Sequence, residues 1–185
     1  GTICYIDDLY TNPESGWWGW LYCMSKGPEL IDTLFLVLRK RPVIFLHWYH
    51  HSVTFLLGQL FYTQYFPWVR PGVIINLGVH TIMYFYYGMR AWGIKTDRWV
   101  SKAITLTQIT QFISGGIIGL HWINAWFYDN LQHCEKTKIE WISVLGVAVV
   151  ASYLYLFMRY YQDAYIKNAS PTQRKIEEPE EAKEA

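Results

Sequence analysis

The sequence has almost no net charge and no strongly basic region. Its 16 Lys and Arg balance 15 Asp and Glu, which gives a net charge of +1 at pH 7 with neutral histidines. Proteins that bind nucleic acid usually carry a basic patch or stripe that neutralises phosphates. Because the chain has neither such a field nor a strip of aromatic and basic residues, we predict no nucleic-acid partner.

The first residues also lack the features of a secretory leader. The chain starts at Gly1 rather than at Met, and residues 1–15 contain neither a basic stretch nor an apolar one. We therefore expect that further sequence precedes Gly1 in the protein.

Charge is scarce within five long apolar stretches. The chain is 52% hydrophobic and 18% aromatic, which is more apolar surface than one soluble core needs. A membrane-spanning helix needs about 20 predominantly apolar residues, and the stretches that qualify are 17–38, 43–63, 73–89, 99–127 and 139–161. We predict an all-α membrane protein, a polytopic helical bundle. Pro28 interrupts the first stretch, which is either one kinked helix or a short segment followed by a helix that starts at Pro28.

Lysine and arginine are distributed unequally between the two ends of these stretches. The larger group consists of Arg39, Lys40, Arg41, Arg90, Lys95, Arg98, Lys102, Arg159, Lys167, Arg174, Lys175 and Lys183, and the smaller group of Arg70, Lys136 and Lys138. Because cytoplasmic loops hold the excess of basic residues, we predict a cytosolic C-terminus. The predicted organisation is a lumenal segment (1–16), a transmembrane domain (17–161) and a disordered cytosolic tail (162–185).

The cysteines fall in two settings. Cys4 and Cys134 lie on the predicted lumenal side, where an oxidising compartment permits a disulfide, and whether the two are bonded stays open. Cys23 lies within the first apolar stretch, where we expect it to pack rather than to react.

Four of the apolar stretches contain polar side chains that are costly in a membrane and usually mark a functional site. These side chains are Lys26, Glu29, Asp32 and Thr33; His47, His50 and His51; Asn76, His80, Tyr84 and Tyr87; and Thr105, Gln108 and Gln111. Each set has helical spacing, and at about 1.5 Å per residue the sets lie roughly 10 to 18 Å from the cytosolic end. We predict that they meet in one polar layer. A single His or Gln is often only a link between helices, and tyrosines are often packing or interfacial residues.

Clustered histidines suggest either a metal site or acyl-transfer chemistry. Membrane di-iron desaturases and hydroxylases resemble this chain in their histidine boxes, but they use about eight histidines, and this chain has 6. One metal on His47, His50, His51 and His80 stays open, although neighbouring side chains on a helix point about 100° apart. The alternative is a neutral imidazole acting as nucleophile or general base on a thioester. A non-enzymatic transporter also needs a polar layer, but no inverted repeat is visible.

The four polar sets together resemble the motifs of the ELO family of very-long-chain fatty acid elongases. The matching stretches are KGPELIDT at 26–33, HWYHH at 47–51, NLGVHTIMYFYY at 76–87 and TLTQITQ at 105–111. They agree with the family in order and spacing, and the resemblance covers residues 26 to about 165. The residues of the second and third motifs are most similar to those of the branch that acts on saturated and monounsaturated long chains.

The resemblance implies a fold and an activity. The family has seven spans around an acyl-CoA tunnel, and this chain matches the third to the seventh. Its members are condensing enzymes of the endoplasmic reticulum membrane. They join a long-chain acyl-CoA to malonyl-CoA, release CO2 and CoA, and leave a 3-ketoacyl-CoA two carbons longer. The resemblance implies no metal or redox cofactor, and it implies the reductases and dehydratase of the elongation cycle as partners.

On this resemblance we assign roles to the polar side chains. His50 attacks the thioester to form an acyl-imidazole, or acts as a general base in a direct condensation. His80, held by Asn76, is an acid, a base or an enolate stabiliser. The remaining assignments are orientation of the cluster for His47 and His51, oxyanion binding for Gln108 and Gln111, a site-shaping ionic network for Lys26, Glu29 and Asp32, site shaping for Tyr84 and Tyr87, and binding of CoA phosphates near Arg39, Lys40, Arg41, Arg90, Lys95 and Arg98.

Overall fold

The structure, a computed structural model, describes residues 12–38, 40, 43–63, 69–128 and 140–167. Within these ranges the chain forms α-helices and one short π-helix, and no strand. The elements are α1 (Pro13–Leu38), α2 (Phe45–Thr63), α3 (Val69–Ala91), α4 (Arg98–Tyr128), α5 (Glu140–Tyr161) and η1 (Gln162–Ile166). The predicted all-helical fold is confirmed, and each predicted stretch corresponds to one helix with boundaries that differ by a few residues.

Helix α1 runs without interruption through Pro28. The alternative in which a separate helix starts at Pro28 is therefore wrong. A proline disfavours the helical conformation of the preceding residue partly through a clash with its Cβ. That residue is Gly27, which has no Cβ, so the helix continues across this position.

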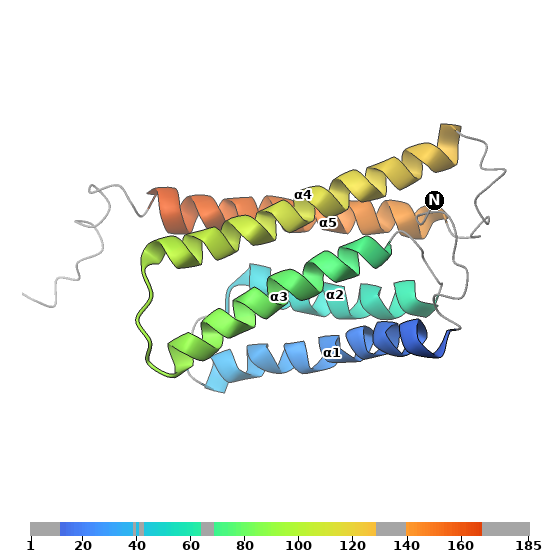
Figure 1. Cartoon of the computed structure of the whole chain (residues 1–185). Helices are drawn as coiled ribbons and strands as arrows, with labels where there is room; N and C mark the ends of the chain where they lie inside the picture. Colours follow the sequence, from blue (N-terminus) through green and yellow to red (C-terminus); the bar gives the residue numbers. More distant parts are fainter. Residues whose placement is uncertain (1–11, 39, 41–42, 64–68, 129–139, 168–185) are drawn as a thin grey trace, which may run out of the picture.

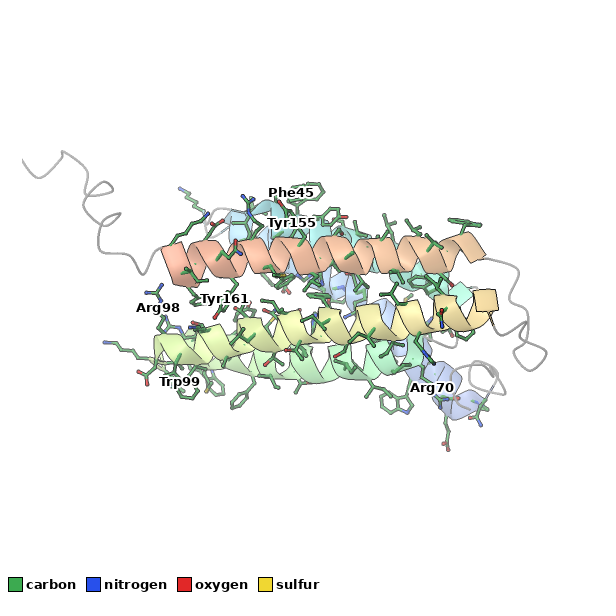
Figure 2. All side chains as sticks on the ribbon, turned by 90° about the horizontal axis from the view of Figure 1, so that it is seen from above. Phe45, Arg70, Arg98, Trp99, Tyr155 and Tyr161 are labelled. Carbon is green, nitrogen blue, oxygen red and sulfur yellow. The ribbon has the colours of Figure 1, made fainter. Side chains whose placement is uncertain are left out.

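The helices form a ring whose neighbours are not all consecutive in sequence. Helix α2 packs on α1 and α5, and α4 packs on α3 and α5. Consecutive helices run in opposite directions, so the C-terminal ends of α1, α3 and α5 and the N-terminal ends of α2 and α4 lie together (Figure 1). Figure 2 shows Arg98 at this end of the bundle and Arg70 at the other. Helices α1 and α3 contact each other mainly through their side chains.

Two hydrophobic clusters hold the ring together. Phe61, Trp122 and Ile142 form one cluster, with contributions from α2, α4 and α5. Phe112, Tyr153 and Phe157 form the other, between α4 and α5. Burial of side chains of this size stabilises the fold by about 1.5–3 kcal/mol each. The clusters therefore fix α2, α4 and α5 relative to one another.

The outer faces of the helices carry large apolar side chains. Those most exposed include Trp18, Leu38, Leu56, Ile74, Phe85, Trp99, Ile117 and Trp141. Two stretches, Arg98–Asn124 and Trp141–Ile166, are long and apolar enough to cross a membrane by length and composition. The other three helices carry the ionisable motif residues. An apolar exterior around a polar interior is the pattern expected in a bilayer.

The helical region extends past the predicted start of the tail. Residues Gln162–Ile166 form η1, which packs against the beginning of α4. Arg98 Nη2 donates a hydrogen bond to the Ala164 carbonyl at 2.7 Å, and the Thr105 and Tyr165 hydroxyls lie 3.3 Å apart. The predicted boundary of the disordered tail after residue 161 is therefore too early, because these contacts order the next turn.

Cys23 is buried, and its Sγ lies 3.5 Å from the Gly58 carbonyl of α2. The prediction that this cysteine packs is confirmed. Cys4 and Cys134, whose pairing was left open, and the acidic tail lie outside the described residues.

Candidate active site

A buried ion pair lies where α1 faces α3. Lys26 Nζ is 2.6 Å from Glu29 Oε1, and the Lys26 side chain is 2% exposed. Lys26 Nζ also donates to Asn76 Oδ1 at 3.0 Å, and the Tyr22 hydroxyl donates to the same oxygen at 3.1 Å. A charge this deep is stable only when it is paired and hydrogen-bonded. The side chains of α1 and α3 satisfy this requirement jointly.

Glu29 also faces two imidazoles. Its Oε2 lies 3.9 Å from His51 Nδ1, and its Oε1 lies 3.7 Å from His80 Nδ1. Both Nδ1 atoms are buried and have no hydrogen-bond partner within the described residues. These separations exceed hydrogen-bond length, but one carboxylate faces the Nδ1 atoms of both rings. Glu29 therefore lies between the histidine motif of α2 and that of α3.

The histidines of α2 diverge, as the helical geometry predicts. His51 faces α1, and its ring centroid is 4.4 Å from that of His47. His50 faces the interior between α4 and α5, with ring centroids 4.7 Å from Tyr153 and 5.9 Å from Phe112. The His50 and His80 centroids are 6.4 Å apart. His50 thus stands on an aromatic wall, next to an imidazole of another helix.

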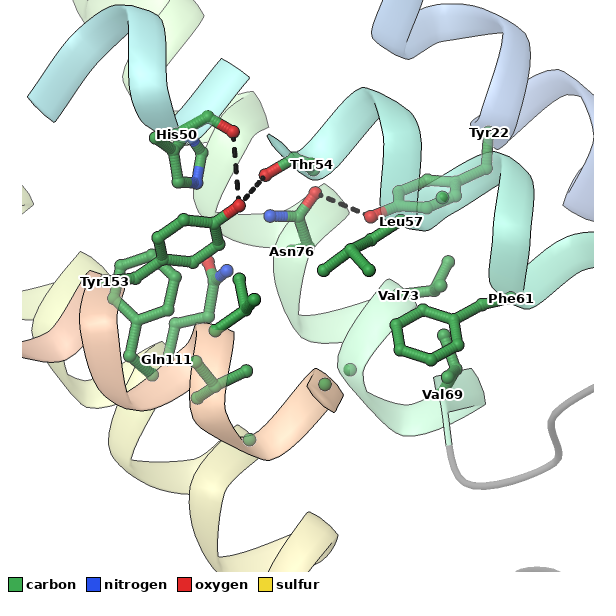
Figure 3. A pocket seen from close by; sticks show the side chains of 17 residues that line it. Tyr22, His50, Thr54, Leu57, Phe61, Val69, Val73, Asn76, Gln111 and Tyr153 are labelled. Atoms are coloured by element: carbon green, nitrogen blue, oxygen red, sulfur yellow. Dashed lines mark hydrogen bonds between the residues drawn. The ribbon is translucent and has the colours of Figure 1, made fainter. Parts of the chain in front are cut away.

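A cavity of about 160 Å³ opens beside His50. One water needs only about 10–15 Å³, so this is a ligand-sized space. Its polar lining consists of Tyr22, His50, Thr54, Asn76, Gln111 and Tyr153, and much of the remainder is apolar: Leu57, Phe61, Val69, Val73, Phe112, Val149 and Val150. Figure 3 shows the polar group around His50, Asn76 and Gln111, and the apolar group around Phe61 and Val69. The cavity is amphipathic, with His50 at its polar part.

Several predicted site residues lie away from the cavity. Asp32 accepts a hydrogen bond from the Tyr84 hydroxyl at 2.7 Å, so it is linked to α3 and not to Lys26. The Tyr87 ring stacks edge-on against Tyr84 with centroids 6.3 Å apart and is half exposed. Gln108 Nε2 donates to Met83 Sδ at 3.4 Å. Of the two glutamines assigned to oxyanion binding, only Gln111 lines the cavity.

The predicted support of His80 by Asn76 is wrong. Within the described residues Asn76 bonds to Lys26 and Tyr22, and His80 faces Glu29 instead. The prediction rested on the spacing within α3 alone. The partners of both side chains come from α1, and spacing within one helix does not report on a neighbouring helix.

Three polar residues of the cavity lining were not predicted. Tyr22 lies one turn before Lys26 on the same face of α1, and this register could have identified it. Thr54 stands in the same relation to His50, one turn further along α2. Its hydroxyl lies 3.0 Å from the Tyr153 hydroxyl, which also donates to the His50 carbonyl at 3.3 Å. Nothing local in the sequence singles out Tyr153.

No three His, Cys, Asp or Glu side chains in the described parts of the chain are grouped so that they could hold a metal ion. The histidines of α2 and α3 instead surround Glu29 and the cavity.

A comparison with protein-family models decides the family. The model described as the GNS1/SUR4 family, ELO, matches residues 1–173. The chain belongs to the ELO family. The resemblance inferred from the four motifs is confirmed over nearly the whole chain, and this ELO-family chain is an all-α, polytopic membrane protein.

Curated proteins of the same family are similar to this ELO chain. Long chain fatty acid elongase 2 of Caenorhabditis elegans is 43% identical over 178 residues, which are 96% of this chain and 64% of that protein. Very long chain fatty acid elongase 6 of Drosophila melanogaster is 34% identical over 95% of this chain and 55% of its own length. The human protein of the latter name is 37% identical over 85% and 58%. The chain spans a little over half the length of these relatives. No solved structure matches the chain.

Proposed function

We propose that this chain carries the catalytic centre of a condensing enzyme of fatty acid elongation. Its substrates are a long-chain acyl-CoA and malonyl-CoA, and its products are CO2, CoA and a 3-ketoacyl-CoA two carbons longer. The observation that carries the proposal is the position of His50, an imidazole beside an otherwise largely apolar cavity. Such a cavity suits a hydrocarbon chain, and the imidazole beside it suits reaction at the thioester carbon. The names of the family relatives support the same reaction.

His50 is the residue that receives the acyl group in this proposal. A ring nitrogen attacks the thioester carbon, the carbonyl electrons move onto oxygen, and collapse of this oxyanion expels CoA as a thiolate. Malonyl-CoA then loses CO2, and the resulting enolate carbon attacks the acyl-imidazole. The new carbon–carbon bond forms as the bond from carbon to His50 breaks, which regenerates the imidazole. In the rival mechanism His50 is a general base and no covalent intermediate forms.

Glu29 orients the other two imidazoles in this scheme. The Glu29 carboxylate faces the Nδ1 atoms of His51 and His80. It therefore favours the tautomer of each ring that carries its hydrogen on Nδ1. A hydrogen-bond acceptor at one ring nitrogen sets which nitrogen of a histidine carries the proton. The Nε2 atom of His80 is then free to accept a proton and, once protonated, to donate it. His80 is accordingly proposed as the acid or base, and His47 and His51 as residues that orient the cluster.

The acyl tail occupies the apolar part of the cavity. Two cavity-lining glycines, Gly58 and Gly72, have no atom within 4 Å of the position where a Cβ would stand. At about 1.5 Å per residue, Gly58 lies roughly 12 Å along α2 from His50 and Phe61 roughly 16 Å. A side chain at position 58 would therefore enter the space through which the tail runs.

The variant Gly58→Leu is expected to shorten the preferred acyl-CoA by about two to four carbons, because the added side chain takes up space that the end of the tail occupies. An extended hydrocarbon chain advances roughly 1.3 Å for each carbon–carbon bond of about 1.5 Å. Rates measured with a series of saturated acyl-CoAs check this. The matched control is Gly78→Leu, since Gly78 is also a helical glycine with open space around its Cβ position but does not line the cavity. An unchanged chain-length profile in Gly58→Leu would contradict the placement of the tail.

The setting of the reaction follows from the family and from the charge distribution. We propose a multi-pass protein of the endoplasmic reticulum membrane with a cytosolic C-terminus. Lys40, Arg90, Lys95 and Arg98 are described residues at the proposed cytosolic end, where they can bind CoA phosphates. The remaining proposed partners are the reductases and the dehydratase that process the 3-ketoacyl-CoA, and no metal or redox cofactor takes part.

The proposal is tested by release of labelled CO2 from malonyl-CoA by the purified protein, expressed in full, in detergent or liposomes. We expect release that depends on a long-chain acyl-CoA and that is accompanied by a labelled 3-ketoacyl-CoA. Absence of acyl-CoA-dependent release from folded protein would contradict the proposed function.

A further inference from the structure

The carboxamide of Asn76 has a defined orientation. Its Oδ1 accepts hydrogen bonds from Lys26 Nζ at 3.0 Å and from the Tyr22 hydroxyl at 3.1 Å. An ammonium group has three donors and no acceptor, so the atom that it contacts must be the amide oxygen. The usual ambiguity between the oxygen and the nitrogen of an asparagine is therefore resolved here by Lys26. The amide nitrogen must point the other way.

The amide nitrogen is unpaired and faces the cavity. Asn76 is 6% exposed, and within the described residues its Nδ2 has no hydrogen-bond partner. Figure 3 shows Nδ2 turned away from Tyr22, toward the part of the cavity where His50 and Tyr153 lie. Nδ2 is not one of the fully buried polar atoms that lack a partner in the described parts of the chain, so a molecule in the cavity can reach it. A donor in this position can bond to an acceptor that a ligand supplies.

We infer that Asn76 donates a hydrogen bond to the carbonyl oxygen of the acyl thioester, and that Lys26 and Tyr22 position it. This inference rests on the proposed function. It assigns oxyanion binding to Asn76 of α3 instead of to the glutamines of α4. It also separates two roles on α3, because Asn76 serves the substrate oxygen and His80 serves proton transfer.

The hydrogen bond strengthens as the reaction proceeds. When a His50 nitrogen bonds to the thioester carbon, the carbonyl π electrons become a full charge on oxygen. A fixed N–H beside that oxygen is worth more for the charged state than for the neutral carbonyl, which lowers the barrier. Lys26 adds to this effect, because its positive charge on Oδ1 polarises the amide and makes Nδ2 a better donor.

Asn76→Asp removes the donor while it retains the supports. An Asp carboxylate oxygen still accepts the bonds from Lys26 and Tyr22, so we expect the thermal stability to change little. The kcat of CO2 release is expected to fall about 10²- to 10³-fold, the usual cost of losing one oxyanion donor. Asn76→Leu removes both the donor and the acceptor and provides a second variant. Tyr22→Phe removes one support, and we expect a smaller fall in kcat of about 5- to 10-fold.

Binding of two inert substrate analogues separates donation from a structural role. One analogue is a CoA ketone, in which a methylene stands between sulfur and carbonyl, and the other is the alkyl thioether of the same length, which has no carbonyl. The full-length protein is expected to bind the ketone about 5- to 10-fold more tightly. This preference is expected to disappear in Asn76→Asp and in Asn76→Leu, and to remain in Tyr62→Phe. Tyr62 is a matched control, because its hydroxyl likewise links two helices: it donates from α2 to the Gly16 carbonyl of α1 at 3.4 Å. Tyr62 does not line the cavity.

Persistence of the ketone preference in both Asn76 variants, with an active wild-type protein, would overturn this inference and leave the proposed function intact. A wild-type protein without acyl-CoA-dependent CO2 release would overturn the proposed function itself. The two failures are therefore distinguishable.

Discussion

The variant His50→Ala is expected to lower acyl-CoA-dependent CO2 release on the order of 10³-fold or more, since it removes the group that we propose reacts with the thioester. His50 is 8% exposed and lines the cavity, and among the described residues no Ser or Cys lines the same cavity to replace it. Expression and thermal stability should remain measurable, because the ring contacts of Tyr153, Phe112 and Phe157 with one another persist without His50. The measurement is the initial rate of CO2 release at saturating concentrations of both substrates.

The control for this variant is His121→Ala. His121 is exposed on α4 and does not line the cavity, so its loss should leave the rate within a few-fold of the wild-type value. A His50→Ala protein that releases CO2 at the wild-type rate would remove His50 from the mechanism.

The second large effect is expected from the ion pair of α1. Glu29→Gln leaves the Lys26 ammonium buried without an anion, and a broken buried pair costs about 3–5 kcal/mol. For a chain of this size that corresponds to a fall in Tm on the order of 10 °C. Asp163→Asn is the control, because the Lys167–Asp163 pair is more than half exposed and exposed pairs contribute little.

The double variant Lys26→Met with Glu29→Gln separates stability from activity. It removes both charges together, so most of the lost stability should return. The rate of CO2 release should stay low, because Asn76 has lost its main support and the two imidazoles no longer face a carboxylate. Thermal unfolding and the CO2 assay on the same preparations check both expectations. Full recovery of the rate in the double variant would show that the pair has no positioning role.

Helix positions and the choice of motif residues could be predicted from the sequence for different physical reasons. Charge-free stretches of about 20 residues locate spans, because a bilayer excludes unpaired polar groups. His50, His51 and His80 stood out because ionisable groups are rare in spans. The three were correctly predicted to lie together, because residues at similar distances from the cytosolic end of neighbouring helices fall in the same layer.

The failures share one cause, which is packing between helices. The partners of Asn76 come from α1, so the orientation of its amide depends on a contact between two helices. Lys26 and Asn76 are 50 residues apart in the sequence. Tyr153 lies on the last long helix among many tyrosines, and in a membrane protein such residues usually indicate packing. The turn Gln162–Ile166 begins with two polar residues in the sequence, and its contacts with Arg98 and Thr105 are not reported by any local pattern.

The most direct measurement is mass spectrometry of the protein after incubation with a long-chain acyl-CoA in the absence of malonyl-CoA. We predict an acyl adduct on the peptide that contains His50, which disappears when malonyl-CoA is added and is replaced by a 3-ketoacyl-CoA in solution. An active protein that never shows acylated His50, even after rapid quenching, would contradict the account.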